Sequence, residues 1–275
     1  MNRDIFLKSL EDNKKLIDNR LHSYFDKSFK LYDPIIYSID SGKRIRASLF
    51  LETLKMLDSS IDDEDIDFAL AIEMIQAYSL IHDDLPAMDN DDWRRGKASL
   101  HKKYGEDIAI LSGDALLNEA SFLALDISTR NPIYIEASRY LFDHTGYKGM
   151  IEGQFLDLKR KESYDLAYLL ETYERKTADL FKGSIVSAGI VRNLSNKEIC
   201  KLKSFAKNLG LAYQIQDDLL EESYQEELNI LNIMEESKAY DLLNNINEKA
   251  REDISKFRKN DFLVQLIDYL SKRDN

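Results

Sequence analysis

The spacing of apolar residues predicts that the chain is helical nearly throughout. Near the N-terminus, Leu7, Leu10, Ile17 and Leu21 recur with the spacing of one face of an amphipathic helix. Similar helical runs follow at about residues 44–57, 68–81, 107–126, 133–142, 164–191, 196–220, 236–257 and 261–270. No stretch alternates apolar and polar residues in the way a half-buried strand does. We therefore predict an all-α protein of about ten helices.

Composition agrees with this prediction. The 275 residues include only 10 glycines and 3 prolines, and so few chain-breaking residues favour long helices. With 44% hydrophobic residues the chain can bury a sizeable core. No repeat, low-complexity linker or shift in composition marks a boundary, so we expect a single domain spanning residues 1–275.

Residues 68–81 form the most apolar stretch, with apolar side chains on every side of the predicted helix. Such a helix is central and packed by neighbours on most faces. Glu73 and Gln76 interrupt the stretch, and it is shorter than the roughly 18–20 residues that a membrane span needs. The N-terminus is charged from Arg3 onward, unlike a signal peptide, and the lone Cys200 fits a reducing compartment. We expect a cytoplasmic protein without a membrane span.

Charge adds the first indication of chemistry. Lys and Arg number 38 against 50 Asp and Glu, a net charge of −12, which argues against a nucleic-acid partner. Five of the carboxylates fall within residues 83–92, directly after the apolar helix, where they repel one another and oppose the helix dipole. A solvated acidic loop is one interpretation. An EF-hand is excluded, because Arg94 stands where that loop requires glycine.

A site for a hard cation such as Mg²⁺ is the other interpretation, because this ion binds carboxylate oxygens and bridges to substrate phosphates. Arg94 and Arg95 follow immediately and supply donors for phosphate oxygens. A second acidic cluster, which contains Asp217 and Glu221 on one helix face, also closes an apolar helix. We expect the two clusters to form opposed walls of one cavity, with metal ions bridging a polyanion between them.

Five ordered motifs resemble those of the trans-prenyltransferases, the family that includes farnesyl and geranylgeranyl diphosphate synthases. The first aspartate-rich motif stands as DDLPAMD at 83–89, followed by Arg94-Arg95-Gly96, and the second as DDLLE at 217–221. The remaining three correspond to the family's GGKRxRP, GQxxD and Lys-Thr elements: SGKRIRA at 41–47, GQFLD at 153–157, and Lys176-Thr177. The resemblance implies an antiparallel helical bundle around a deep central cavity, and a homodimer.

The implied reaction is the head-to-tail condensation of isopentenyl diphosphate with an allylic diphosphate, dimethylallyl or geranyl. Mg²⁺ ions, about three per active site, would stabilise the departing diphosphate as Lewis acids. The resemblance assigns metal binding to carboxylates of both motifs, namely Asp83, Asp84, Asp89, Asp217, Asp218 and Glu221. The released pyrophosphate would take the proton that the product loses.

The resemblance also assigns the substrate contacts. Arg94 and Lys176 would bind the allylic diphosphate, and Thr177 and Gln214 would direct oxygen dipoles at the allylic cation. The isopentenyl diphosphate would be bound by Lys43, Arg46 and Arg95, together with Gln76, which stands where relatives usually have histidine. Gln154 and Asp157 either orient other groups or contact substrate. We interpret His82, His101 and Asp114 as structural.

Product length in the family depends on residues just before the first motif. Tyr78 lies five residues before Asp83, where a bulky ring would stop the growing chain early. Together with the two extra residues inside DDLPAMD, this resembles the bacterial type that makes farnesyl diphosphate. The alternatives are a geranyl or geranylgeranyl diphosphate synthase, or a weakly active subunit of a two-component prenyltransferase. A class I terpene cyclase and an acidic helical scaffold fit the motifs less well.

The chain departs from the family after the second motif. Relatives have a loop of about twenty residues there, with two lysines aimed at the allylic diphosphate, whereas here no basic residue lies between Glu221 and Lys238. Either the loop is shortened, which would weaken allylic binding, or the sequence lacks part of it. We favour the second interpretation, because acidic residues beside a diphosphate site would oppose the chemistry. Glu221 itself replaces the family's usual third aspartate.

Overall fold

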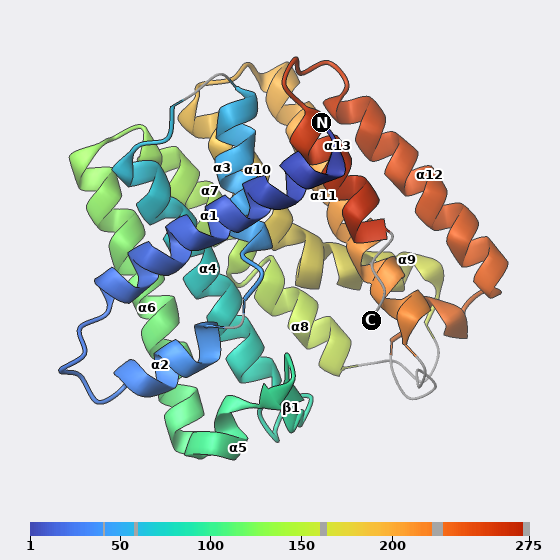
Figure 1. Ribbon diagram of the computed structural model, residues 1–275. Helices are drawn as coiled ribbons and strands as arrows, with labels where there is room; N and C mark the ends of the chain where they lie inside the picture. Colours follow the sequence, from blue (N-terminus) through green and yellow to red (C-terminus); the bar gives the residue numbers. More distant parts are fainter. Residues whose placement is uncertain (41, 58–59, 160–163, 222–227, 272–275) are drawn as a thin grey trace. The chain divides into compact units, whose positions relative to one another are not determined.

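The computed structural model describes residues 1–40, 42–57, 60–159, 164–221 and 228–271 (Figure 1). Within these residues the chain forms thirteen α-helices, one π-helical segment, one 3-10 turn and a two-stranded ribbon, which confirms the all-α prediction. The count exceeds ten partly because the run predicted at 164–191 is divided in three. Residues 222–227, where the family's lysine loop was expected to begin, lie outside the described part of the chain.

The chain divides into two compact units. We call residues 7–51 and 61–135 the N-terminal unit, and residues 1–6, 52–60 and 136–275 the C-terminal unit. The single domain and the central cavity expected from the sequence stay predictions.

The N-terminal unit is built around α4 (Asp63–Asp83), the helix predicted to be central. Asp62 and Asp65 form a capping box at its start, and the residues from Phe68 to Ile75 are all buried. Helix α6 (Glu106–Arg130) packs alongside α4 (Figure 1). The other elements are α1 (Arg3–Tyr24), α2 (Tyr32–Ile39), α3 (Ile45–Met56), β1 (Trp93–Arg94), β2 (Lys97–Ala98) and α5 (Leu100–Tyr104).

The C-terminal unit is built around α11 (Asn196–Leu220), which begins at a capping box between Ser195 and Glu198. Helices α10 (Asp179–Val191) and α12 (Glu236–Ile254) pack against it (Figure 1). The other elements are α7 (Tyr134–Thr145), α8 (Met150–Leu158), α9 (Leu166–Tyr173), the π-helical segment η1 (Glu174–Ala178), the 3-10 turn η2 (Ile230–Asn232) and α13 (Asp261–Ser271).

Helix α6 is long and apolar enough to cross a membrane by length and composition. One such helix is weak evidence for a span, because core helices of globular proteins pass the same test. The packing of α6 against α4 buries part of the apolar surface of α6 inside the N-terminal unit.

Candidate active site

The first aspartate-rich motif forms a closed turn at the end of α4. The backbone N–H of Asp89 donates to the carbonyl of Asp83 over 2.9 Å, and that of Asn90 donates to the carbonyl of Leu85 over 3.1 Å. Residues 83 and 89 therefore stand at the two ends of one turn. Asp83 is half-buried and Asp89 is exposed. Two carboxylates presented in this way match the one or two that Mg²⁺ takes from a protein when substrate phosphates supply further ligands.

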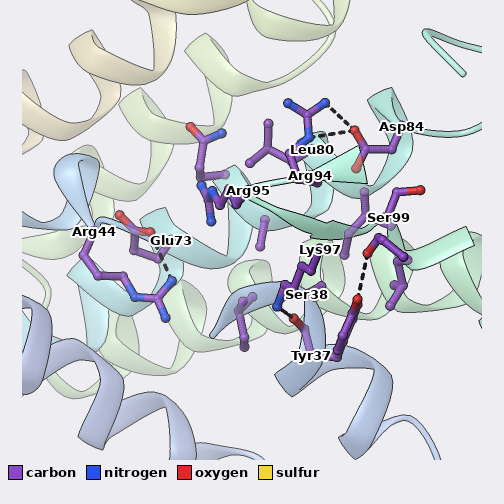
Figure 2. A pocket seen from close by; sticks show the side chains of 16 residues that line it. Tyr37, Ser38, Arg44, Glu73, Leu80, Asp84, Arg94, Arg95, Lys97 and Ser99 are labelled. Atoms are coloured by element: carbon purple, nitrogen blue, oxygen red, sulfur yellow. Dashed lines mark hydrogen bonds and ion pairs between the residues drawn. The ribbon is translucent and has the colours of Figure 1, made fainter. Parts of the chain in front are cut away.

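Asp84 has a different role in this turn, since it is 3% exposed and paired with Arg94. Both Nε, at 2.8 Å, and Nη2 of Arg94 donate to its Oδ1 (Figure 2). Nη2 also donates to Asp91 over 2.9 Å. Burial raises the pKa of Asp84, and Arg94 acts in the opposite direction. The carboxylate thus holds a guanidinium that the family resemblance assigns to the allylic diphosphate.

A hairpin places the two arginines that follow this motif. Strands β1 and β2 pair antiparallel with Arg94 opposite Lys97, and the turn between them has positive φ at both Arg95 (53°) and Gly96 (76°). Positive φ at both central residues is the type I′ geometry that matches the twist of a two-residue hairpin. Arg94 and Lys97 therefore lie side by side, and Arg95 lies at the tip.

Arg95 and Lys97 line a narrow pocket of the N-terminal unit, of about 30 Å³, together with Arg44, Glu73 and Gln76 (Figure 2). Arg44 is buried, donates to Asp18 over 2.7 Å and lies 3.8 Å from Glu73. Desolvation lowers the pKa of Arg95. The negative charge of Glu73 acts in the opposite direction, and the positive charge of Arg44 lowers this pKa further. Arg94 and Asp84 also line the pocket, which therefore carries four cations against two buried carboxylates, Glu73 and Asp84. Lys43 beside it in sequence is exposed and Arg46 is half-buried.

Glu73 and Lys97, like Arg44, line this pocket without having been assigned a role from the sequence. Glu73 was noted only as an interruption of the apolar helix, although a charge at a buried position is itself a signal of a partner. It accepts a hydrogen bond from the backbone N–H of Ala47 over 3.0 Å. Lys97 donates to the carbonyl of Tyr37 and lies 4.2 Å from the centre of that ring. Desolvation lowers the pKa of Lys97.

Tyr78 and the nearby histidines are packed into the N-terminal unit. Tyr78 is 6% exposed, and burial, followed by Asp83, raises its pKa to about 12. The ring of His82 lies 5.9 Å from that of Tyr78, and its Nε2 is 3.2 Å from the carbonyl of Ile110. His101 is buried, and its Nδ1 lies 3.0 Å from the hydroxyl oxygen of Ser99. Asp114 is exposed and lies 3.9 Å from His82.

In the C-terminal unit, Lys176 and Thr177 lie in the π-helical segment η1. Lys176 Nζ donates to Asp157 of the GQFLD motif over 2.5 Å, so that Asp157 orients the lysine. A Cβ on residue 153 would lie 2.1 Å from the backbone nitrogen of Lys176, and one on residue 210 would lie 2.5 Å from Cα of Ala178. Glycines on α8 and α11 therefore let both helices approach the η1 backbone closely.

The second aspartate-rich motif ends α11. Asp218 is 2% exposed and accepts hydrogen bonds from the hydroxyl of Tyr173 and from the backbone N–H of Ile230, the latter over 2.8 Å. Burial raises its pKa to about 7, against the effect of these hydrogen bonds. Glu221 accepts from Asn229 Nδ2 over 3.1 Å. Asp217 is half-buried.

Comparison with known proteins decides what these two sites belong to. A model of the polyprenyl synthetase family matches residues 29–253. The farnesyl diphosphate synthase of Micrococcus luteus is 41% identical over 223 residues, covering 80% of this chain and 74% of the relative. The chain belongs to the polyprenyl synthetase family. It is a prenyltransferase and makes short-chain prenyl diphosphates, as the resemblance of its motifs implied.

Other relatives of this polyprenyl synthetase include proteins named farnesyl diphosphate synthase and proteins named geranylgeranyl pyrophosphate synthase. The farnesyl diphosphate synthase of Bacillus subtilis is 36% identical over 227 residues, covering 79% of this chain and 76% of the relative. The chloroplastic geranylgeranyl pyrophosphate synthase of Catharanthus roseus is 33% identical over 268 residues, covering 90% and 74%. A solved geranyltransferase from Legionella pneumophila matches with a TM-score of 0.89 at 29% identity, covering 99% and 97%. The chain therefore has the isoprenoid synthase fold.

The family of this polyprenyl synthetase uses Mg²⁺, and the assignment of six carboxylates to that ion stays a prediction. Among the described residues, no group of three or more His, Cys, Asp or Glu side chains gathers to hold a metal ion. Asp84, Asp218 and Glu221 have protein partners, as described above. Asp83 and Asp89, at the two ends of one turn, would suit an ion that substrate phosphates help to bind, and Asp217 would contribute from the second motif.

Proposed function

We propose that this chain condenses isopentenyl diphosphate head-to-tail with dimethylallyl and then geranyl diphosphate, giving farnesyl diphosphate. The observation that carries the proposal is the cationic pocket beside the closed turn of Asp83 and Asp89. Relatives named farnesyl diphosphate synthases, at 36–41% identity, support the product. The buried ring of Tyr78 also supports it, since a short product needs a floor close to the first motif.

The allylic diphosphate would be bound by two cations that carboxylates already orient. Asp84 and Asp91 hold Arg94, and Asp157 holds Lys176. Asp83, Asp89 and Asp217 would hold Mg²⁺, which when bound would supply Lewis-acid stabilisation of the leaving group. Orienting these side chains in advance reduces the entropy lost when the diphosphate binds.

Isopentenyl diphosphate would be bound by the second set of cations, Lys43, Arg46 and Arg95, with Gln76 donating a hydrogen bond. Arg95 lies at the hairpin tip, and the pocket it lines holds little more than one water molecule.

In the reaction, the allylic C–O bond breaks and its electron pair leaves with the diphosphate. The double bond of isopentenyl diphosphate attacks the allylic cation, and the released pyrophosphate takes the proton that the adduct loses. Thr177 and Gln214 stabilise the cation with their oxygen dipoles. The Thr177 hydroxyl donates to Gln214 Oε1 over 3.0 Å, which links the two groups.

Geranylgeranyl diphosphate is the second candidate product, because the relatives that align with about 90% of this chain are geranylgeranyl pyrophosphate synthases. The test incubates the purified chain with Mg²⁺, dimethylallyl diphosphate and radiolabelled isopentenyl diphosphate, followed by chromatography of the dephosphorylated products. A fifteen-carbon alcohol supports the proposal, and a twenty-carbon alcohol supports the alternative. A chain that is inactive alone would indicate the subunit of a two-component enzyme.

The proposal includes a homodimer in the cytoplasm. Helix α6 leaves Ile110, Leu111, Phe122 and Leu125 exposed, and an exposed apolar surface of this kind is typical of an interface. Light scattering after gel filtration should give about twice the 31.9 kDa mass of one chain. A monomer at micromolar concentration would contradict this part of the proposal.

A further inference from the structure

The side chain of Gln214 lies between Thr177 and Asp218 in the C-terminal unit. Its Oε1 accepts the hydroxyl proton of Thr177 over 3.0 Å, and its Nε2 donates to Oδ1 of Asp218 over 3.3 Å. Residues 214 and 218 are one helical turn apart on α11, so their side chains share a face. The three side chains form a chain of hydrogen bonds from η1 to the second aspartate-rich motif.

Asp218 decides which way the amide of Gln214 faces. A threonine hydroxyl can either donate or accept, so Thr177 accommodates either end of the amide. An ionised carboxylate can only accept, so it requires the NH₂ group. With Asp218 on one side, the amide oxygen is therefore turned toward Thr177.

The Asp218 carboxylate is itself held firmly. The Tyr173 hydroxyl and the backbone N–H of Ile230 both donate to Oδ2, which leaves Oδ1 for Gln214. The side chain is 2% exposed, so little room remains for it to turn toward a metal ion. The metal-binding role that the resemblance implies for Asp218 stays a prediction beside these contacts.

We infer that Asp218 is a positioning residue that orients the Gln214 amide, so that Gln214 and Thr177 present oxygens to the allylic cation. The inference rests on the proposed function, since it concerns the step in which that cation forms. The negative charge of Asp218 polarises the amide through Nε2 and increases the electron density on Oε1. Without this charge the amide is free to turn and to present N–H groups, whose positive ends oppose the cation.

The test replaces Asp218 with Asn and then compensates for the change. In D218N the new NH₂ group faces that of Gln214, and one of the two amides must turn. In Q214E/D218N, a carboxylate at position 214 can accept both from Thr177 and from the amide introduced at position 218. Steady-state kinetics at pH 8 should show kcat about 100-fold lower in D218N, with both KM values and the Mg²⁺ concentration for half-maximal rate changed less than about threefold. The kcat of Q214E/D218N should be at least about tenfold higher than that of D218N.

Asp253→Asn is the matched control. Asp253 is also buried and also accepts from an amide on α11, Asn208 Nδ2, over 3.5 Å, but it lies on α12 and forms no part of the site. D253N should leave kcat unchanged. A kcat for D218N within threefold of wild type, or no recovery in Q214E/D218N, would overturn the inference. So would a parallel rise in the Mg²⁺ requirement, which would make Asp218 a metal ligand.

A second readout separates this inference from the proposed function. The side-chain amide resonances of Gln214, assigned by their absence in Q214L, should shift in D218N and remain in place in D253N. If the wild-type chain makes no prenyl product but these resonances shift as expected, the proposed function fails and the orientation of Gln214 stands. Unchanged resonances in D218N would overturn the orientation whatever the activity.

Discussion

Gly153 on α8 lies so close to the backbone of Lys176 that a Cβ at position 153 would stand 2.1 Å from the lysine nitrogen. No side-chain rotation can relieve such an overlap, because both partners are backbone. The glycine of the GQFLD motif is therefore required by packing against the π-helical segment that carries Lys176 and Thr177.

Gly153→Ala should destabilise the protein by about 3 kcal/mol and reduce kcat, because the added methyl pushes α8 away from η1. Urea unfolding and steady-state assays measure the two effects. Glu152→Ala, on the same turn of α8, is the control and should change neither by much. Equal stability of G153A and wild type would show that the two segments separate freely.

Asp83→Asn should reduce kcat by about 1,000-fold or more, because it removes an anionic oxygen from the turn that fits Mg²⁺. Asp92→Asn is the control, since Asp92 is an exposed carboxylate of the same loop paired with Lys102. Turnover is measured across a range of Mg²⁺ concentrations. Near-normal rates for D83N would refute its assignment to the metal.

Tyr78→Ala should lengthen the product, because removing a buried ring just before the first motif opens space for further isoprene units. Chromatography of radiolabelled products should show twenty-carbon or longer chains. Tyr78→Phe keeps the ring and should keep the product of the wild type. An unchanged spectrum in Y78A would place the floor of the cavity elsewhere.

Lys97→Ala should raise the KM for isopentenyl diphosphate about tenfold while the KM for the allylic substrate stays constant. The reason is that Lys97 lines the same cationic pocket as Arg95. Lys102→Ala, which removes a surface lysine of the neighbouring helix α5, should change neither value. A rise confined to the allylic KM would assign Lys97 to the other substrate.

The stability of the protein should depend on the pH through Asp179, which is buried at the start of α10. Burial raises the pKa of Asp179, although Lys182 and His144 act in the opposite direction. The folded state therefore binds this proton more tightly than the unfolded state. That contribution to stability is fully present below about pH 4 and is lost as the pH rises through the raised pKa.

Asp179→Asn should remove this pH dependence. Urea unfolding at pH 4.5 and pH 7.5 should show D179N gaining stability relative to wild type at the higher pH. A difference between the two proteins that stays constant with pH would show that the pKa of Asp179 is the same in the folded and unfolded states.

The motifs and the fold class could be predicted from the sequence because both depend on local order. Helical periodicity is a property of neighbouring residues, and few glycines and prolines interrupt it. The five motifs, read in order, were sufficient to indicate the family.

Only the tertiary structure decided what each charged side chain does. Asp83 and Asp84 are adjacent in sequence, yet one stands at the end of a closed turn and the other is buried against Arg94. Asp218 likewise differs from Asp217 because Tyr173, 45 residues earlier, donates to it. A carboxylate binds whatever the fold brings within hydrogen-bonding distance. The sequence by itself determined which chemistry the chain carries, and the packing of distant segments decided which partners its charged side chains meet.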